Sequence, residues 1–229
     1  MGVHEGHRER LKARFLEHGL NSFSDIEALE LLLFYAIPRR DTNELAHLLI
    51  KRFGSLSGVL AAEYNDLKDV PGVGNSAATL IKLVPQMLKL SRIDDSSRAR
   101  SPITSSQAAG DYFIPRFMFE DEEIALLACL DPQKRVIACT ELARGVVDSV
   151  QASPRRIVET ALKFRASSVI LAHNHPGSIA QPSEDDLKMT QQICSSLALV
   201  GITLTDHIIV AGEDYVSLAD TGMINSDAY

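Results

Sequence analysis

The sequence predicts an α+β protein in which an all-helical N-terminal domain precedes a mixed sheet flanked by helices. Residues 1–92 carry apolar side chains at helical spacing behind recognisable helix caps. Residues 103–229 alternate short apolar, β-branched runs with helical patterns, as expected for a sheet covered by helices. Residues 93–102 are polar, of mixed charge and without apolar periodicity, so we expect them to link the two domains.

Three helices are predicted in the first part of the N-terminal domain. The first covers residues 8–18. The second opens with a capping box, in which Ser24 is the N-cap and Glu27 lies three positions on, and it ends at Pro38. The third covers residues 41–53, with leucines along one side.

Residues 67–81 resemble a helix-hairpin-helix motif. Gly72 and Gly74 would let the turn expose backbone N–H groups at the start of the next helix, where the helix dipole favours a phosphate oxygen. Such a turn would contact the DNA backbone without reading base edges, with Lys68 and Lys82 as nearby cations. A plain connector between two packed helices explains the same residues, so both interpretations stay open.

The second domain is predicted to contain eight elements in a mixed order. They are a helix over 106–115, strands over 122–130 and 135–142, a helix over 154–163, a strand over 167–172, a helix over 183–199, and strands over 202–210 and 215–218.

The candidate metal ligands follow the buried strand over residues 167–172. If the strand continues, His173 and His175 point to the same face, because side chains alternate with a period of two. A helix beginning near Ser183 would bring Asp186 back over them. Two histidines and one aspartate are the ligand set of a catalytic zinc site with an open position. Ser183 and Asp186 also form a capping box, and one serine can serve both purposes.

The pattern His173-x-His175-x7-Ser183-x-x-Asp186 resembles the signature of the JAB/MPN (JAMM) metalloprotease superfamily. The surrounding sequence is similar to one bacterial branch, the RadC family, and the resemblance covers nearly the whole chain. The family order after the proline is Ser-Gly, whereas this chain has Gly177-Ser178, which changes the loop but not the ligands. The segments that carry the RadC resemblance are 153–158, 172–176 and 206–210.

The resemblance implies a JAB/MPN-like fold and a Zn²⁺-dependent hydrolase that cuts a peptide, isopeptide or related amide bond in a peptide or protein substrate. In the family pattern, a glutamate at the start of an upstream strand is the general base, and Glu122 occupies that place. Glu123 is one residue away and is the alternative, because predicted strand starts are uncertain by a residue or two. Ser183 matches the family serine that helps to bind the oxyanion.

Three further residues near the ligands have structural or supporting interpretations. Asn174 faces away from the metal if the strand alternation holds, and we expect it to shape the loop. Asp206-His207 is another RadC feature. It either supplies a hydrogen-bond partner to a ligand histidine or forms a hydrogen-bonded pair at the start of its strand.

The charge distribution bears on two alternative functions. The net charge is −7, with +1 in residues 1–92 and −8 in residues 93–229. The acidic second half argues against broad nucleic-acid binding there, because phosphate contacts need basic surface. A DNA-repair-associated protein that binds DNA through its N-terminal domain is one alternative, and a non-catalytic MPN-type scaffold is the other.

The remaining composition indicates a cytoplasmic protein. Cys129, Cys139 and Cys194 are an odd number of widely spaced cysteines in apolar contexts, and we expect all three to be buried and reduced. The chain starts without the apolar run of a signal peptide. Its longest apolar run, residues 31–37, is far shorter than the roughly 20 residues that span a membrane.

Overall fold

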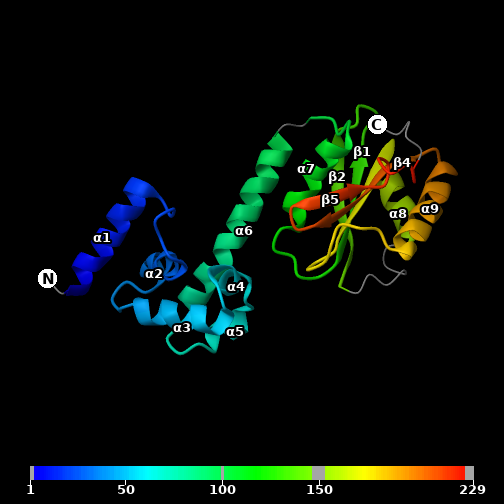
Figure 1. Ribbon diagram of the computed structural model, residues 1–229. Coiled ribbons are helices and arrows are strands. Elements are labelled where there is room, and N and C mark those ends of the chain that lie inside the picture. Colours follow the sequence, from blue (N-terminus) through cyan, green and yellow to red (C-terminus); the bar gives the residue numbers. More distant parts are fainter. Residues whose placement is uncertain (1–2, 99–100, 146–152, 225–229) are drawn as a thin grey trace. The chain divides into compact units, whose positions relative to one another are not determined.

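The computed structural model describes residues 3–98, 101–145 and 153–224, and it has the predicted α+β fold (Figure 1). The chain divides into two compact units, Met1–Leu88 and Lys89–Tyr229. The boundary between them lies inside one long helix, so we describe each unit by itself.

The first unit consists of helices joined by turns and loops, and its described residues form no strand. Its core is built from apolar side chains of the second to sixth helices, among them Leu29, Leu33, Leu49 and Ile81, all with no exposed area. These side chains recur at helical spacing, which explains why the sequence pattern predicts the helices. The elements are α1 (Val3–His18), α2 (Asp25–Ala36), α3 (Asn43–Phe53), α4 (Leu56–Ala61), α5 (Tyr64–Lys68) and α6 (Asn75–Arg98).

The second unit is organised around a five-stranded sheet with the order β2-β1-β3-β4-β5. The central strand β3 pairs in parallel with β4 and antiparallel with β1, and the two outer pairs are also antiparallel. The elements are α7 (Ser106–Phe117), β1 (Ile124–Leu130), β2 (Val136–Arg144), α8 (Pro154–Lys163), β3 (Ser168–Asn174), α9 (Glu184–Ala198), β4 (Thr203–Ala211) and β5 (Asp214–Ser217).

Helices cover both faces of this sheet (Figure 1). On one face, Phe113 of α7 packs with Ile170 of β3 and its even-numbered neighbours. On the other face, Ile157 of α8 and Ile193 of α9 pack with Leu171 and other odd-numbered strand residues. All seven residues of β3 are buried, so polar side chains at its carboxyl end lie inside the protein.

Several elements differ from the sequence-based expectations; α1, for example, begins at Val3 and not at residue 8. Residues 93–98, expected to be linker, continue α6, because extending an existing helix avoids the cost of a new nucleus. Residues 99–100 lie outside the described part. Helix α4 is not predicted from the sequence; it has six residues and is capped by Ser55. Strand β1 begins at Ile124 and not at Glu122.

The prediction of three buried cysteines is correct only for Cys129. Cys139 is exposed because its strand, β2, lies at the edge of the sheet, where alternate residues meet solvent. Cys194 is half-buried at the margin of the core between α9 and the sheet. Within the described ranges, we find no helix with the length and apolar character that a membrane crossing requires.

Candidate metal centre

The carboxyl end of β3 and the first turn of α9 bring the three candidate ligands together. His173 Nε2 lies 3.0 Å from His175 Nε2 and 3.4 Å from Asp186 Oδ1, and His175 Nε2 lies 3.9 Å from Asp186 Oδ2. The donor atoms of the three side chains all lie within 4.8 Å of one another. The alternation along β3 and the return of the chain through α9 therefore produce the predicted cluster.

The chemistry of the three donors fits a zinc ion. Two ligands that each lie about 2.0–2.1 Å from a tetrahedral zinc are about 3.3 Å from each other. The two imidazole nitrogens at 3.0 Å, and His173 Nε2 and Asp186 Oδ1 at 3.4 Å, are close to this separation, while His175 Nε2 lies 3.9 Å from the other oxygen of Asp186. Three protein ligands would leave the fourth tetrahedral position for water or substrate, which is the arrangement of catalytic zinc sites.

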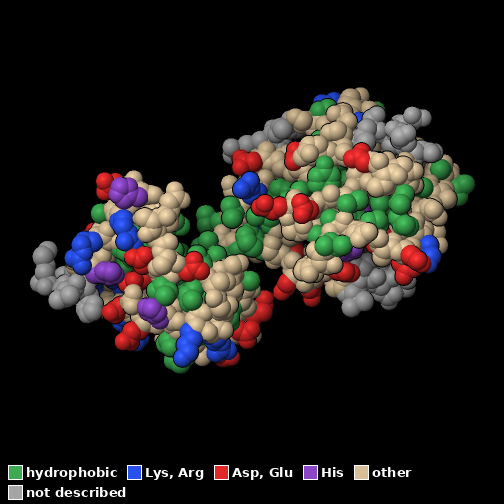
Figure 2. Space-filling model, viewed as in Figure 1, with side chains coloured by type: hydrophobic (Ala, Val, Ile, Leu, Met, Phe, Trp, Pro, Cys, Tyr) green, Lys and Arg blue, Asp and Glu red, His purple; other side chains and the backbone are tan. Residues whose placement is uncertain are grey.

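Burial keeps His173 in the neutral form that a metal requires. The side chain is buried under α9, unlike the histidines visible on the surface of the helical unit (Figure 2). Burial lowers the pKa of His173 to about 4, the neighbouring His175 lowers it as well, and Asp186 opposes both. At neutral pH, His173 therefore has a free lone pair on one ring nitrogen.

A capping box positions Asp186. Its Oδ2 accepts hydrogen bonds from the Ser183 backbone N–H at 2.8 Å and from the Ser183 hydroxyl at 2.6 Å, while its own N–H donates to Ser183 Oγ at 3.1 Å. Asp186 Oδ1 is the oxygen nearest to His173. The cap and the cluster coexist, and the Ser183 hydroxyl proton is directed at Asp186. Oxyanion binding by Ser183 stays a prediction.

His175 lies one residue beyond β3 and is more exposed than His173. Its Nδ1 is 3.3 Å from the carbonyl oxygen of Ile179, in the loop that leads to α9. A carbonyl only accepts hydrogen bonds, so Nδ1 carries the proton in this contact. The Nε2 lone pair is therefore directed at the cluster.

Asp206 and His207 have different partners. His207 is the expected hydrogen-bond partner of a ligand histidine, whereas the other interpretation, a pair at the start of the strand, is wrong because β4 begins at Thr203, three residues before Asp206. His207 Nε2 lies 2.8 Å from His173 Nδ1, and His207 Nδ1 lies 2.6 Å from the hydroxyl of Thr190 on α9. Burial lowers the pKa of His207 well below its usual value, and His173 lowers it further. Asp206 instead accepts a hydrogen bond from the Ser217 hydroxyl at 2.6 Å and ties β4 to β5.

Asn174 has a structural role, as expected, but it supports a different segment from the expected loop. The side chain is buried and reaches the segment before β1, where its oxygen accepts from the Ile124 N–H at 2.6 Å. Its amide nitrogen donates to the carbonyl of Glu122 at 3.0 Å. Asn174 therefore fixes the backbone on both sides of Glu123 to the strand that carries the histidines.

Neither candidate base lies in a strand, because β1 begins at Ile124, after both glutamates. Both glutamate side chains are exposed. Ala125 pairs with His173, and both side chains lie on the face covered by α8 and α9. Ile124 packs on the opposite face. If the alternation continues before the strand, Glu123 shares the face of His173 and Glu122 does not. The choice between the two glutamates stays a prediction.

The turn between α5 and α6 contains both glycines of the helix-hairpin-helix pattern. Gly72 has φ of +96°, and Gly74 comes just before α6. The amine of Lys68 donates to Asn75, and the amine of Lys82 donates at 2.9 Å to a backbone carbonyl of the loop before α5. Both lysines thus have partners within the protein, and DNA binding by this turn stays a prediction.

Thr190 is the residue near the cluster that the sequence patterns do not indicate. It lies four residues after Asp186, on the same side of α9, and is buried. The four-residue spacing from Asp186 could have indicated that Thr190 lies near the cluster, because residues four apart on a helix are neighbours.

Comparison with known proteins identifies the family. Residues 103–223 match the model of the RadC-like JAB domain, and residues 5–79 match the UPF0758 N-terminal domain. The chain is 35% identical to UPF0758 protein Bxeno_A3578 of Paraburkholderia xenovorans, over 92% of this chain and 83% of the relative. It is 32% identical to UPF0758 protein FN0909 of Fusobacterium nucleatum, over 96% and 97% of the two chains. The chain therefore belongs to the RadC-like JAB-domain family.

Proposed function

We propose that this protein is a zinc-dependent hydrolase of the JAMM type, which cleaves a peptide, isopeptide or related amide bond. The observation that carries the proposal is the cluster of His173, His175 and Asp186, whose donor atoms all lie within 4.8 Å of one another. Membership of the RadC-like JAB family is compatible with this activity.

The residues around the cluster would divide the chemistry between them. A zinc ion held there would act as a Lewis acid and would lower the pKa of a nearby water towards about 7. The three ligands hold the metal, and a glutamate before β1 takes the proton of the attacking water. The same glutamate then returns the proton to the nitrogen of the departing amine, which completes the hydrolysis.

Glu122 and Glu123 are both candidates for the general base. The family pattern favours Glu122, whereas the pairing of Ala125 with His173 favours Glu123, because alternation places Glu123 on the metal face. The Asn174 bonds to the backbone of Glu122 and Ile124 would hold the backbone of both glutamates at a fixed place relative to the histidines.

The first test is the metal content of the purified protein by elemental analysis. The wild type is compared with His173→Ala and Asp186→Ala, each of which removes one ligand. We expect about one zinc per chain in the wild type and none in either variant. A wild type that holds no metal and takes up no added zinc at neutral pH would overturn the proposal.

The second test is hydrolysis of a panel of fluorogenic peptides and lysine-linked isopeptides by the zinc-loaded protein. Glu122→Gln and Glu123→Gln keep the shape of each side chain and remove its basicity. The general base is the glutamate whose replacement abolishes activity while zinc stays bound. Full activity in both variants would exclude these two residues as the base. Zinc binding without hydrolysis of any substrate in the panel would favour the non-catalytic scaffold.

A further inference from the structure

A chain of buried polar contacts connects one candidate ligand to the backbone of another. It starts at His173 Nδ1, continues through His207 Nε2 and Nδ1 at 2.8 and 2.6 Å, and reaches the hydroxyl of Thr190. The Thr190 hydroxyl lies 2.6 Å from the backbone carbonyl oxygen of Asp186. His173, His207 and Thr190 are all buried, so water does not compete for these bonds.

The direction of the whole chain follows from the carbonyl at its end. The Asp186 carbonyl oxygen can only accept, so the single hydroxyl proton of Thr190 is donated to it. At its other contact, the Thr190 oxygen must therefore accept a proton, and His207 Nδ1 must be the donor. If Thr190 donated its proton to His207 instead, the Thr190 hydroxyl oxygen and the Asp186 carbonyl oxygen would face each other at 2.6 Å with no proton between them.

The same reasoning sets the proton on the ligand. A neutral imidazole has one N–H, so His207 with a protonated Nδ1 presents a lone pair at Nε2. That lone pair accepts from His173 Nδ1, which must then carry the only proton of its ring. His173 Nε2 is left with a lone pair that faces the unprotonated His175 Nε2 at 3.0 Å and Asp186 Oδ1 at 3.4 Å. These facing donors have no proton between them, so a cation shared by the three ligands would stabilise the arrangement.

We propose that Thr190 and His207 are positioning residues, which hold His173 in the Nδ1-protonated tautomer and so keep Nε2 ready to bind zinc. The inference rests on the proposed zinc site and deepens it. A metal-binding histidine usually donates its second N–H to a carboxylate, a backbone carbonyl or water. Here the acceptor is a neutral imidazole, whose orientation depends on a hydroxyl in the helix that carries the third ligand.

The affinity of the protein for zinc, measured by competition with a coloured chelator, tests the role of the hydroxyl. Thr190→Val keeps the shape of the side chain and removes the acceptor for His207, and we expect zinc binding to weaken about 10- to 100-fold. Thr190→Ser retains a hydroxyl and should restore most of the affinity. Thr160→Val is the matched control, because the Thr160 hydroxyl also donates to the carbonyl four residues earlier in its helix, away from the cluster. Equal affinities of Thr190→Val and the wild type would overturn the proposal.

Nitrogen-15 NMR of the imidazole rings in the metal-free wild-type protein tests the tautomers without zinc. We expect His173 and His207 both to show a protonated Nδ1 and an unprotonated Nε2. A protonated Nε2 on either ring would overturn the inference even if the protein binds zinc. If the predicted tautomers are present but zinc does not bind, the positioning holds and the proposed zinc-dependent function fails.

Discussion

Two helices of this protein begin with the same capping box, α2 at Ser24 and α9 at Ser183, and in both the acid lies three residues on. Glu27 Oε2 accepts from the Ser24 N–H and hydroxyl at 2.9 and 3.1 Å. Asp186 Oδ2 accepts from the Ser183 N–H and hydroxyl at 2.8 and 2.6 Å. One carboxylate oxygen is thus used in the same way in both units.

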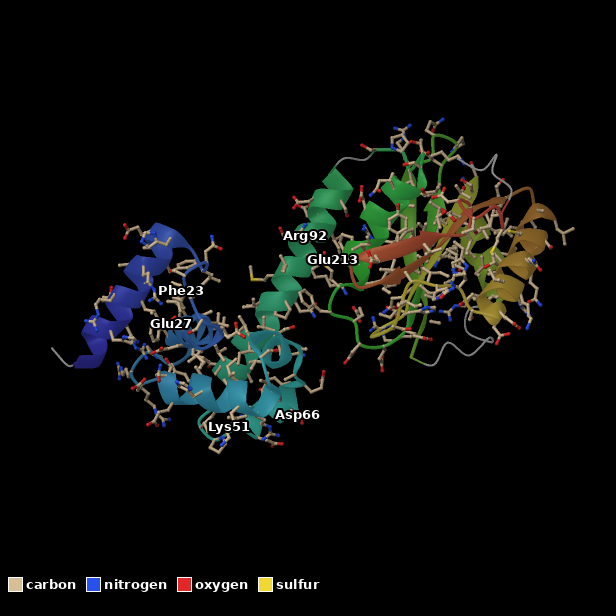
Figure 3. The ribbon with its side chains drawn as sticks, in the orientation of Figure 1. Phe23, Glu27, Lys51, Asp66, Arg92 and Glu213 are labelled. Atoms are coloured by element: carbon tan, nitrogen blue, oxygen red, sulfur yellow. The ribbon has the colours of Figure 1, made fainter. Side chains whose placement is uncertain are left out.

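The second oxygen of each carboxylate distinguishes the two sites. Glu27 Oε1 accepts a hydrogen bond from the Arg14 guanidinium at 2.6 Å. The same guanidinium lies 4.2 Å from the centre of the Phe23 ring, and Phe23 and Glu27 are labelled next to each other in Figure 3. Asp186 Oδ1 faces His173 instead. A cation within the protein completes the first site, whereas the second has two imidazoles that can share a metal. The role of a capping acid is therefore decided by what lies opposite its free oxygen.

The largest expected difference between the two sites is their response to zinc. Zinc at about 1,000 times its dissociation constant should stabilise the unit that contains Asp186 by about 4 kcal/mol, because it binds the folded form alone. Hydrogen exchange measured by mass spectrometry should show slower exchange in β3 and α9 and no change in α2. The Asp186→Ala variant should show no protection. Equal protection of α2 and α9 from hydrogen exchange would contradict the proposed difference between the two capping sites.

A smaller effect is expected when the caps themselves are removed. Ser24→Ala and Ser183→Ala should each lower the free energy of unfolding by about 1 kcal/mol, as loss of an N-cap usually does. Ser183→Ala should also weaken zinc binding about tenfold, because the Asp186 carboxylate loses a hydrogen bond that orients it. Urea unfolding and zinc titration measure the two effects.

Ser105→Ala is the matched control for this experiment. Ser105 caps α7 in the same unit through its hydroxyl oxygen, which accepts from the Ala108 N–H at 3.2 Å, and it is not part of the cluster. It should lose stability without losing zinc affinity. If Ser183→Ala behaves in the same way, then Ser183 is only a helix cap.

The smallest expected effect is the pH dependence of the Glu27 cap. The Ser24 backbone N–H and the Arg14 guanidinium lower the pKa of Glu27 from 4.5 to about 2. Its carboxylate should therefore stabilise the folded state fully above about pH 4.5, and this contribution should be lost as the pH falls through about 2. Because the pair is partly exposed, we expect about 1 kcal/mol at neutral pH.

Urea unfolding of the wild type and Glu27→Gln between pH 7 and pH 2 measures this contribution. The difference in unfolding free energy between them should shrink as the pH falls below 4.5 and become small by pH 2. A difference that stays constant over this range would show that the charge of Glu27 contributes nothing to stability.

Much of the fold and the three candidate ligands could be predicted from the sequence, because the signals are local. Apolar spacing determined the helices and strands, and the two capping boxes determined where α2 and α9 begin. The period of two in a strand placed His173 and His175 on one face. Each of these patterns depends on residues only a few positions apart, so no knowledge of distant contacts is required.

Tertiary structure alone decided how the site is supported. The partner of Asn174 lies 50 residues away at the start of β1, and the ring of His207 meets His173 across 34 residues and Thr190 across 17. Strand pairing also determined where β1 begins, at Ile124 and so after both glutamates. These contacts depend on the register between strands and on how α9 packs against the sheet, which no local pattern encodes.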